Sequence, residues 1–147
     1  MDPDRVAALE RRLDHVFRDP ALLARALTHA SYANEHPPTP DQEGLALLGD
    51  AVLALVVVER LLEQDPAGPV GVLSPRRAAL VSGANLARWA THLELGPLLR
   101  LGRGEDQTGG RTRESILATT LEAVLGGVYL EAGLAAARCV VGRLAAW

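Results

Sequence analysis

The sequence predicts an all-α fold, and three observations support this prediction. Of the 147 residues, 48% are apolar but only 3% are aromatic, so Leu, Val and Ala must fill the core. That composition favours packed helices over a β-sandwich. Apolar residues recur at helical spacing along most of the chain, and the length suits one domain. We therefore expect residues 1–147 to form a single helical bundle around two apolar central helices.

Two helices and a loop are predicted first. Four apolar residues at helical spacing mark an amphipathic helix: Val6, Leu9, Leu13 and Val16. Asp19 and Pro20 then open a second helix over residues 21–30. Three prolines exclude a helix from residues 34–41, which we interpret as a stiff loop.

The longest predicted helix covers residues 42–64 and is apolar on every side except at Asp50. Such a helix is either buried at the centre of a protein or spans a membrane. Asp50 interrupts an apolar run that is already shorter than the roughly 20 residues of a membrane span. We therefore interpret this segment as a buried central helix.

Two shorter helices and two loops follow. Residues 65–71 are predicted to form a loop, after which Ser74 and Pro75 begin a helix. The next helix, over residues 85–95, ends at Gly96 and Pro97. Residues 98–113 contain four glycines and are expected to form an exposed loop.

A second strongly apolar helix is predicted over residues 115–131. Glu122 is its only carboxylate before the last residue. Gly133 breaks the pattern, and residues 134–144 form a closing helix.

Charge and cysteine content narrow the classes of function. The net charge is -3, and all 15 basic residues are arginine. A dedicated nucleic-acid binder usually has a basic surplus, so the charge argues mildly against tight RNA binding without excluding a local basic patch. Cys139 is the only cysteine, so we expect no disulfide, no zinc site and a cytoplasmic location. The charged N-terminus does not resemble a signal peptide.

Each of the two most apolar helices carries one acid near its middle, Asp50 and Glu122. A buried charge must be neutralised, paired or bound to a metal. Glu43, position 46 and Asp50 share one narrow sector of their helix. If the two helices pack with these faces together, Glu43, Asp50 and Glu122 converge on a pocket suited to Mg²⁺. Alternatively, each acid pairs with an arginine or caps a loop.

Four ordered segments resemble the ribonuclease III family. Residues 27–34 read LTHASYAN and residues 42–53 read QEGLALLGDAVL, similar to LTHxS followed by NERLEFLGDAVL. Residues 73–81, LSPRRAALV, resemble LSxLRAxLV. Residues 109–131, GGRTRESILATTLEAVLGGVYLE, are similar to GGxxRxSILADxxEALIGAIYLD.

The resemblance implies an all-helical endonuclease domain that dimerises and cleaves double-stranded RNA with Mg²⁺ or Mn²⁺. Metal-activated water attacks the phosphodiester in such enzymes. By position, Asp50 and Glu122 match metal ligands, and Glu43 matches the first acid of the signature, which makes these three the candidate catalytic residues. The resemblance covers the endonuclease domain only, and we expect no double-stranded-RNA-binding domain.

Several positions depart from the family pattern. The two remaining metal-ligand positions hold Ala46 and Thr119 instead of carboxylates. The signature's Asn and Arg are Gln42 and Gly44, and Val70 stands where many members carry an acid. Losing two anionic ligands should lower Mg²⁺ affinity steeply, so binding of Mg²⁺ or Mn²⁺ is expected to be weak or absent.

Three functional hypotheses follow. The preferred one is a ribonuclease III-like pseudoenzyme, a homodimer that binds double-stranded or structured RNA in RNA processing but cleaves it weakly or not at all. The second is an active Mg²⁺-dependent endoribonuclease of the short type. The third is a dimerising interaction protein that no longer contacts RNA. The candidate RNA contacts are Arg77, Arg103, Arg111 and Arg113.

Overall fold

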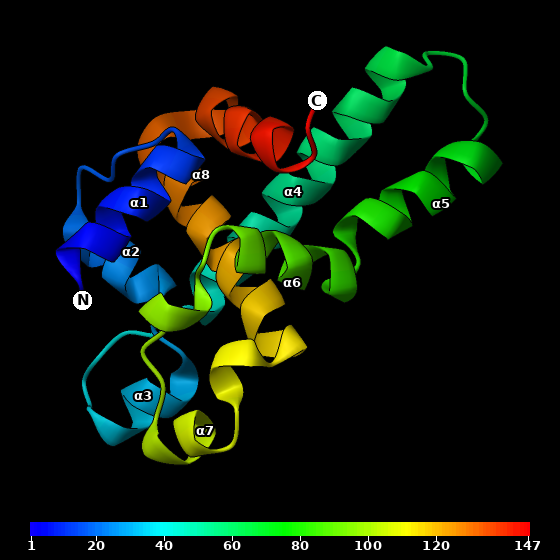
Figure 1. The fold of residues 1–147 in the computed structure, drawn as a ribbon. Coiled ribbons are helices and arrows are strands. Elements are labelled where there is room, and N and C mark those ends of the chain that lie inside the picture. Colours follow the sequence, from blue (N-terminus) through cyan, green and yellow to red (C-terminus); the bar gives the residue numbers. More distant parts are fainter.

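The computed structural model describes residues 1–147 and confirms the all-α prediction. It contains no strands, only an isolated bridge between Thr28 and Arg100. Figure 1 shows two long helices, α4 and α8, crossing near the centre, with the shorter helices around them. The helices are α1 Pro3–Leu13, α2 Pro20–Ala26, α3 Ala30–Glu35, α4 Glu43–Gln64, α5 Val70–Val81, α6 Gly83–His92, α7 Arg103–Gln107 and α8 Glu114–Leu144, with the 3₁₀ turns η1 Gly96–Leu98 and η2 Gly110–Thr112.

The crossing of α4 and α8 depends on two glycines. A Cβ atom at Gly49 would lie 1.7 Å from the carbonyl oxygen of Glu122, and one at Gly126 would lie 2.2 Å from that of Leu45. Real Cβ atoms do not approach backbone this closely, so the two helices touch through their backbones at this point. This contact brings the residues beside each glycine within reach of the opposite helix.

The core forms mainly along α8. Its buried side chains include Leu121, Val124 and Val128. The helix is long and apolar enough to cross a membrane by length and composition alone. Its place in the core explains the same composition, because a helix surrounded by other helices is apolar on most sides.

The prediction of a buried central helix over residues 42–64 holds for one face only. One face of α4 packs in the core through residues such as Leu53 and Val57. The opposite face exposes Leu47 to 75% and Leu55 to 50%. The apolar run therefore lines two faces of α4. In the single chain one face packs in the core and the other is exposed to solvent.

Several predicted boundaries differ from the structure. The second helix ends at Ala26, not at residue 30, because Thr28 pairs with Arg100 and His29 caps α3. The helix expected from Ser74 begins one turn earlier at Val70, with Pro75 inside it. The expected loop over residues 98–113 contains α7 and η2. The break at Gly133 is confirmed by its φ of 86°, a conformation that glycine adopts without a steric penalty.

The side chain of Gln42 joins the start of α4 to α2 and α8. Its side chain is almost fully buried, and its Nε2 donates to the carbonyl oxygen of Ala26 at 2.8 Å and to Thr120 Oγ1 at 3.1 Å. The Thr120 hydroxyl in turn donates to the Ile116 carbonyl oxygen at 2.7 Å. These buried bonds join α2, α4 and α8, since a buried polar group that lost its partner would cost about 1–3 kcal/mol.

We predict that Gly126→Ala destabilises the protein by at least about 3 kcal/mol, because the new methyl meets backbone and not a movable side chain. Gly142→Ala is the matched control. Gly142 lies in the same helix, and its Cβ would meet nothing within 4 Å. This control should be neutral or stabilising by about 0.5–1 kcal/mol. Urea denaturation of both variants measures the difference, and equal midpoints would contradict the proposed close crossing.

Candidate functional site

Asp50 and Glu122 meet at the crossing of α4 and α8. Asp50 follows Gly49 directly, and Glu122 provides the backbone carbonyl against which Gly49 packs. The two carboxyl groups are close enough to share a hydrogen bond. The structure therefore brings together the two acids that the sequence analysis assigned as metal ligands.

Glu122 is a strongly perturbed acid. Burial, the hydrogen bond with Asp50 and the negative charge of Asp50 together raise the pKa of Glu122 from 4.5 to about 8. A carboxyl group with this pKa is mostly protonated at neutral pH. The raised pKa thus keeps a proton on Glu122 beside Asp50 near neutrality.

The prediction of two buried acids holds only in part. Glu122 is partly buried, but Asp50 is exposed on the surface of α4. Asp50 retains water contact because the exposed face of α4 begins beside it. Its charge therefore needs no arginine partner.

Glu43 does not join this pair. No group of three or more His, Cys, Asp or Glu side chains is placed to hold a metal ion, so the expected convergence of Glu43, Asp50 and Glu122 is wrong. Glu43 and Asp50 share a helix face but lie seven residues apart, a separation of about 10 Å along the axis at 1.5 Å per residue. Glu43 is exposed, and its charge acts on His29 instead.

Ala46 and Thr119 are both partly buried. The Ala46 methyl packs against the core, and the Thr119 hydroxyl is neutral. Mg²⁺ prefers octahedral oxygen coordination with carboxylates to balance its charge. One carboxylate beside one protonated acid does not fit a multi-carboxylate magnesium centre.

His29 has a structural role in this region. Its Nδ1 accepts from the backbone N–H of Ser31 at 3.1 Å and so caps α3. Ser31 Oγ accepts from the Gly102 N–H at 2.8 Å and lies 2.8 Å from the same His29 Nδ1. Burial lowers the pKa of His29, although Glu43 and Asp41 oppose this effect. The imidazole is therefore neutral at pH 7 and caps α3, while Ser31 joins α3 to the segment after Leu101.

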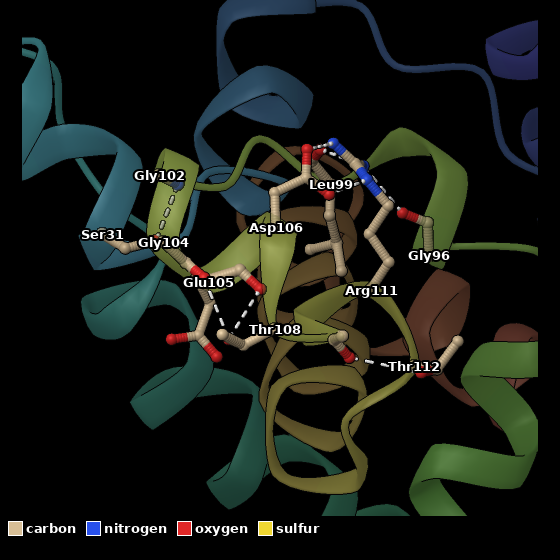
Figure 2. A network of polar contacts seen from close by, with 11 residues as sticks. Ser31, Gly96, Leu99, Gly102, Gly104, Glu105, Asp106, Thr108, Arg111 and Thr112 are labelled. Atoms are coloured by element: carbon tan, nitrogen blue, oxygen red, sulfur yellow. Dashed lines mark hydrogen bonds and ion pairs between the residues drawn. The ribbon is translucent and has the colours of Figure 1, made fainter.

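Two of the four candidate RNA contacts are used inside the protein. Figure 2 shows Arg111 between the Asp106 carboxylate and the carbonyl oxygens of Gly96 and Leu99, bonded at 2.8, 3.1 and 2.7 Å. Arg113 pairs with Glu105 and donates to the Thr108 carbonyl oxygen. Both arginines thus hold the α7 loop in place.

Arg77 and Arg103 are the two candidates with available side chains. Both are exposed, on α5 and at the start of α7. Neither guanidinium takes part in a hydrogen bond or ion pair within the chain, although the Arg103 backbone N–H donates to Glu35. These two residues remain candidates for contact with phosphate.

The sequence analysis missed the contact between Tyr32 and Arg100. The Arg100 guanidinium lies over the Tyr32 ring, with Cζ 4.4 Å from its centroid. The two residues are far apart in sequence and belong to no shared motif. Only the bridge between Thr28 and Arg100 brings them together.

This chain has clear relatives in sequence and in fold. The family model described as ribonuclease-III-like matches residues 19–146, and the chain belongs to this family. The chain is 53% identical over 136 residues to ribonuclease 3 of Streptomyces coelicolor, covering 92% of this chain and 49% of that protein. It is 49% identical over 138 residues to ribonuclease 3 of Heliobacterium modesticaldum, covering 92% of this chain and 59% of that protein.

A solved structure is also similar. The nuclease domain of ribonuclease III from Campylobacter jejuni superposes with a TM-score of 0.88 at 40% identity, covering 95% of this chain and 94% of that one. The structure is described as showing flexibility in a region involved in dimer formation. The chain spans about half to three fifths of the length of the two ribonuclease 3 relatives but nearly all of this nuclease domain.

We predict that Glu122→Gln becomes more stable relative to the parent protein as the pH rises. The folded state raises the pKa of Glu122 to about 8, so its stabilising contribution is complete below about pH 4.5 and is lost as the pH passes 8. Glutamine mimics the protonated acid and does not titrate.

Urea denaturation at intervals from pH 4.5 to 9 measures this difference. Glu63→Gln, an exposed position near the end of α4, is the control and should show no trend. A constant difference between Glu122→Gln and the parent protein across this range would show that Glu122 titrates normally.

Proposed function

We propose that this protein is a ribonuclease III-like homodimer that binds double-stranded or structured RNA and cleaves it weakly or not at all. The observation that carries this proposal is the reduced acid cluster. Only Asp50 and Glu122 meet at the helix crossing, and no third ligand is placed with them. On this view the fold is retained while the chemistry is impaired.

The electrostatics of the pair support this proposal. In the family pattern, four carboxylates offset the charge of the metal, whereas Ala46 and Thr119 offer none. The proton on Glu122 must also leave before that oxygen can bind a cation, which makes binding less favourable at neutral pH. We therefore expect weak or absent binding of Mg²⁺ or Mn²⁺.

An exposed apolar stripe on α4 supports a homodimer. Its members recur at helical spacing along one face: Leu47, Ala51, Leu55, Val58 and Leu62. Nearby α5 has no buried residue, and Figure 1 shows it beside the C-terminal half of α4, extending beyond the other helices. Contiguous exposed apolar surface of this kind marks an interface. A second copy of the chain is the proposed occupant, in line with the dimer-forming nuclease domain of the Campylobacter relative.

The availability of Arg77 and Arg103 supports RNA as the ligand. An exposed arginine without an acidic partner can donate to phosphate oxygens, which supply most of the affinity for a nucleic-acid backbone. A homodimer would present each arginine twice, which suits the two strands of a duplex. The net charge of -3 leads us to expect modest affinity with a clear salt dependence.

We predict that the parent protein cleaves labelled duplex RNA slowly or not at all with Mg²⁺ or Mn²⁺. The double substitution Ala46→Glu with Thr119→Asp should raise the rate at least about tenfold, because it returns the two missing anionic ligands. Gel analysis of the cleaved products measures both rates.

Asp50→Ala and Glu122→Ala are the controls. Robust cleavage by the parent protein that either change abolishes would overturn the proposal and identify an active endonuclease. If the double variant binds RNA but stays inactive, the defect lies in the geometry of the dimer and not in the missing ligands.

We predict that Leu47→Glu dissociates the dimer. A buried unpaired carboxylate in the interface costs at least about 2 kcal/mol, or roughly thirtyfold in the dissociation constant. Val16→Glu is the matched control, because Val16 is 71% exposed but lies outside the stripe. Sedimentation velocity over a concentration series measures both. A monomeric parent protein, or equal dissociation constants for the two variants, would refute the proposed interface.

A further inference from the structure

A three-layer stack lies on the surface beside α3. The Arg100 guanidinium lies 4.4 Å from the Tyr32 ring centroid, and the His36 ring lies 4.1 Å from the same centroid with its plane inclined by 15°. Two planar groups cannot occupy one face of a ring at these distances. Tyr32 is therefore enclosed between them, with Arg100 on one face and His36 on the other.

The Arg100 side chain forms no hydrogen bond and no ion pair within the chain, although its backbone is firmly held. The Arg100 N–H donates to the Leu27 carbonyl oxygen at 2.8 Å, and the Arg100 carbonyl oxygen accepts from the His29 N–H at 3.0 Å. His36 is held as well, because its Nδ1 lies 3.0 Å from the Tyr32 carbonyl oxygen. The stack is thus a fixed platform whose guanidinium keeps all five donors available.

A hollow of about 430 Å³ adjoins this platform. Its lining combines an apolar wall from Pro97 and Leu98, the cation of Arg100 and the carboxylate of Asp2. Small-molecule sites commonly have this size, with apolar walls and a few polar groups. The hollow is separate from the pair of acids, because neither Asp50 nor Glu122 lines it.

We propose that this hollow binds one unpaired nucleotide of an RNA strand. The base would lie along the apolar wall and the stacked side chains, as bases do on aromatic and guanidinium planes. The guanidinium of Arg100 would donate to the adjoining phosphate, and the Asp2 carboxylate would accept from a sugar hydroxyl or a base amino group. A paired base inside a duplex offers no free face, so the site is specific for single-stranded segments.

A free phosphate is a poorer occupant of this hollow. Arg100 is its only basic side chain, beside the α-amino group of Met1, and Asp2 brings a negative charge to the same wall. Isolated cations near the surface hold an anion weakly in water. Base stacking must therefore provide most of the affinity.

This inference rests on the proposed function only in taking RNA as the ligand, and it is tested separately. The probe is a fluorescently labelled single-stranded tetranucleotide RNA, titrated with the full chain and followed by anisotropy. Arg100→Gln removes the plane on which the base would stack, and Tyr32→Leu removes the ring that supports that plane. Each should weaken binding about fivefold to tenfold, since one stacked base contributes on the order of 1–3 kcal/mol. Inorganic phosphate should compete only weakly.

Three controls accompany these variants. Arg88→Gln removes the same charge from the exposed face of α6 and should leave binding unchanged. Tyr32→Phe keeps the stacked ring and should bind within about twofold of the parent protein. Thermal unfolding of each variant verifies its fold.

A second titration compares a blunt RNA duplex with the same duplex carrying a single-stranded extension. The extension should improve affinity for the parent protein but not for Arg100→Gln. If the blunt duplex fails to bind while the tetranucleotide binds through Arg100, the result supports the nucleotide site and refutes the proposed binding of duplex RNA. If Arg100→Gln and Tyr32→Leu bind the tetranucleotide as the parent protein does, or nothing binds it, the nucleotide site is overturned, whatever the duplex does.

Discussion

The backbone contact between α4 and α8 is the constraint on which the other features of this protein depend. Gly49 and Gly126 have no side chains, so each helix can press against a carbonyl group of the other. The contact sets which residues face each other across the crossing. It places Asp50 against Glu122 and, at the start of α4, Gln42 against Thr120. Any side chain at either glycine would separate the helices and pull both pairs apart.

The same closeness explains the chemistry of the acids. Two carboxyl groups held together repel each other when both are charged, and partial burial adds to this cost. The protein resolves the conflict with a proton, which the raised pKa of Glu122 keeps in place near neutrality. A metal ion would resolve it differently, by neutralising both groups, but Ala46 and Thr119 add no anionic oxygen beside them. The weak metal binding that we propose follows from this shortage.

The positive charges are divided between arginines that hold the structure and arginines with available side chains. Arg111 and Arg113 stand in a glycine-rich segment and would be natural contacts for phosphate. However, Arg111 is bonded to Asp106 and backbone carbonyl groups (Figure 2), and Arg113 is bonded to Glu105 and the Thr108 carbonyl oxygen. The chain thus uses part of its limited positive charge to order the α7 loop. Arg77, Arg103 and Arg100 are left to meet a ligand, and they lie on different elements of the surface. The RNA binding that we propose is therefore expected to be local and sensitive to salt.

The sequence by itself determined the helical class, the two apolar central helices, the break at Gly133 and the identity of the two acids that meet. These properties follow from local spacing and from motif order, which a linear pattern records. The sequence also identified the two positions that lack the family's carboxylates, because Ala46 and Thr119 can be read from it directly. The sequence did not predict that one face of α4 is exposed, because an apolar run does not reveal whether its second face meets the core or solvent.

Only the tertiary structure decided where side chains lie relative to one another. The exposure of Asp50 depends on which face of α4 meets α8. The stack of Arg100, Tyr32 and His36 depends on one bridge between segments far apart in the chain. Packing between distant residues has no period in the sequence, and for that reason the fold could be predicted while the geometry of its surfaces could not.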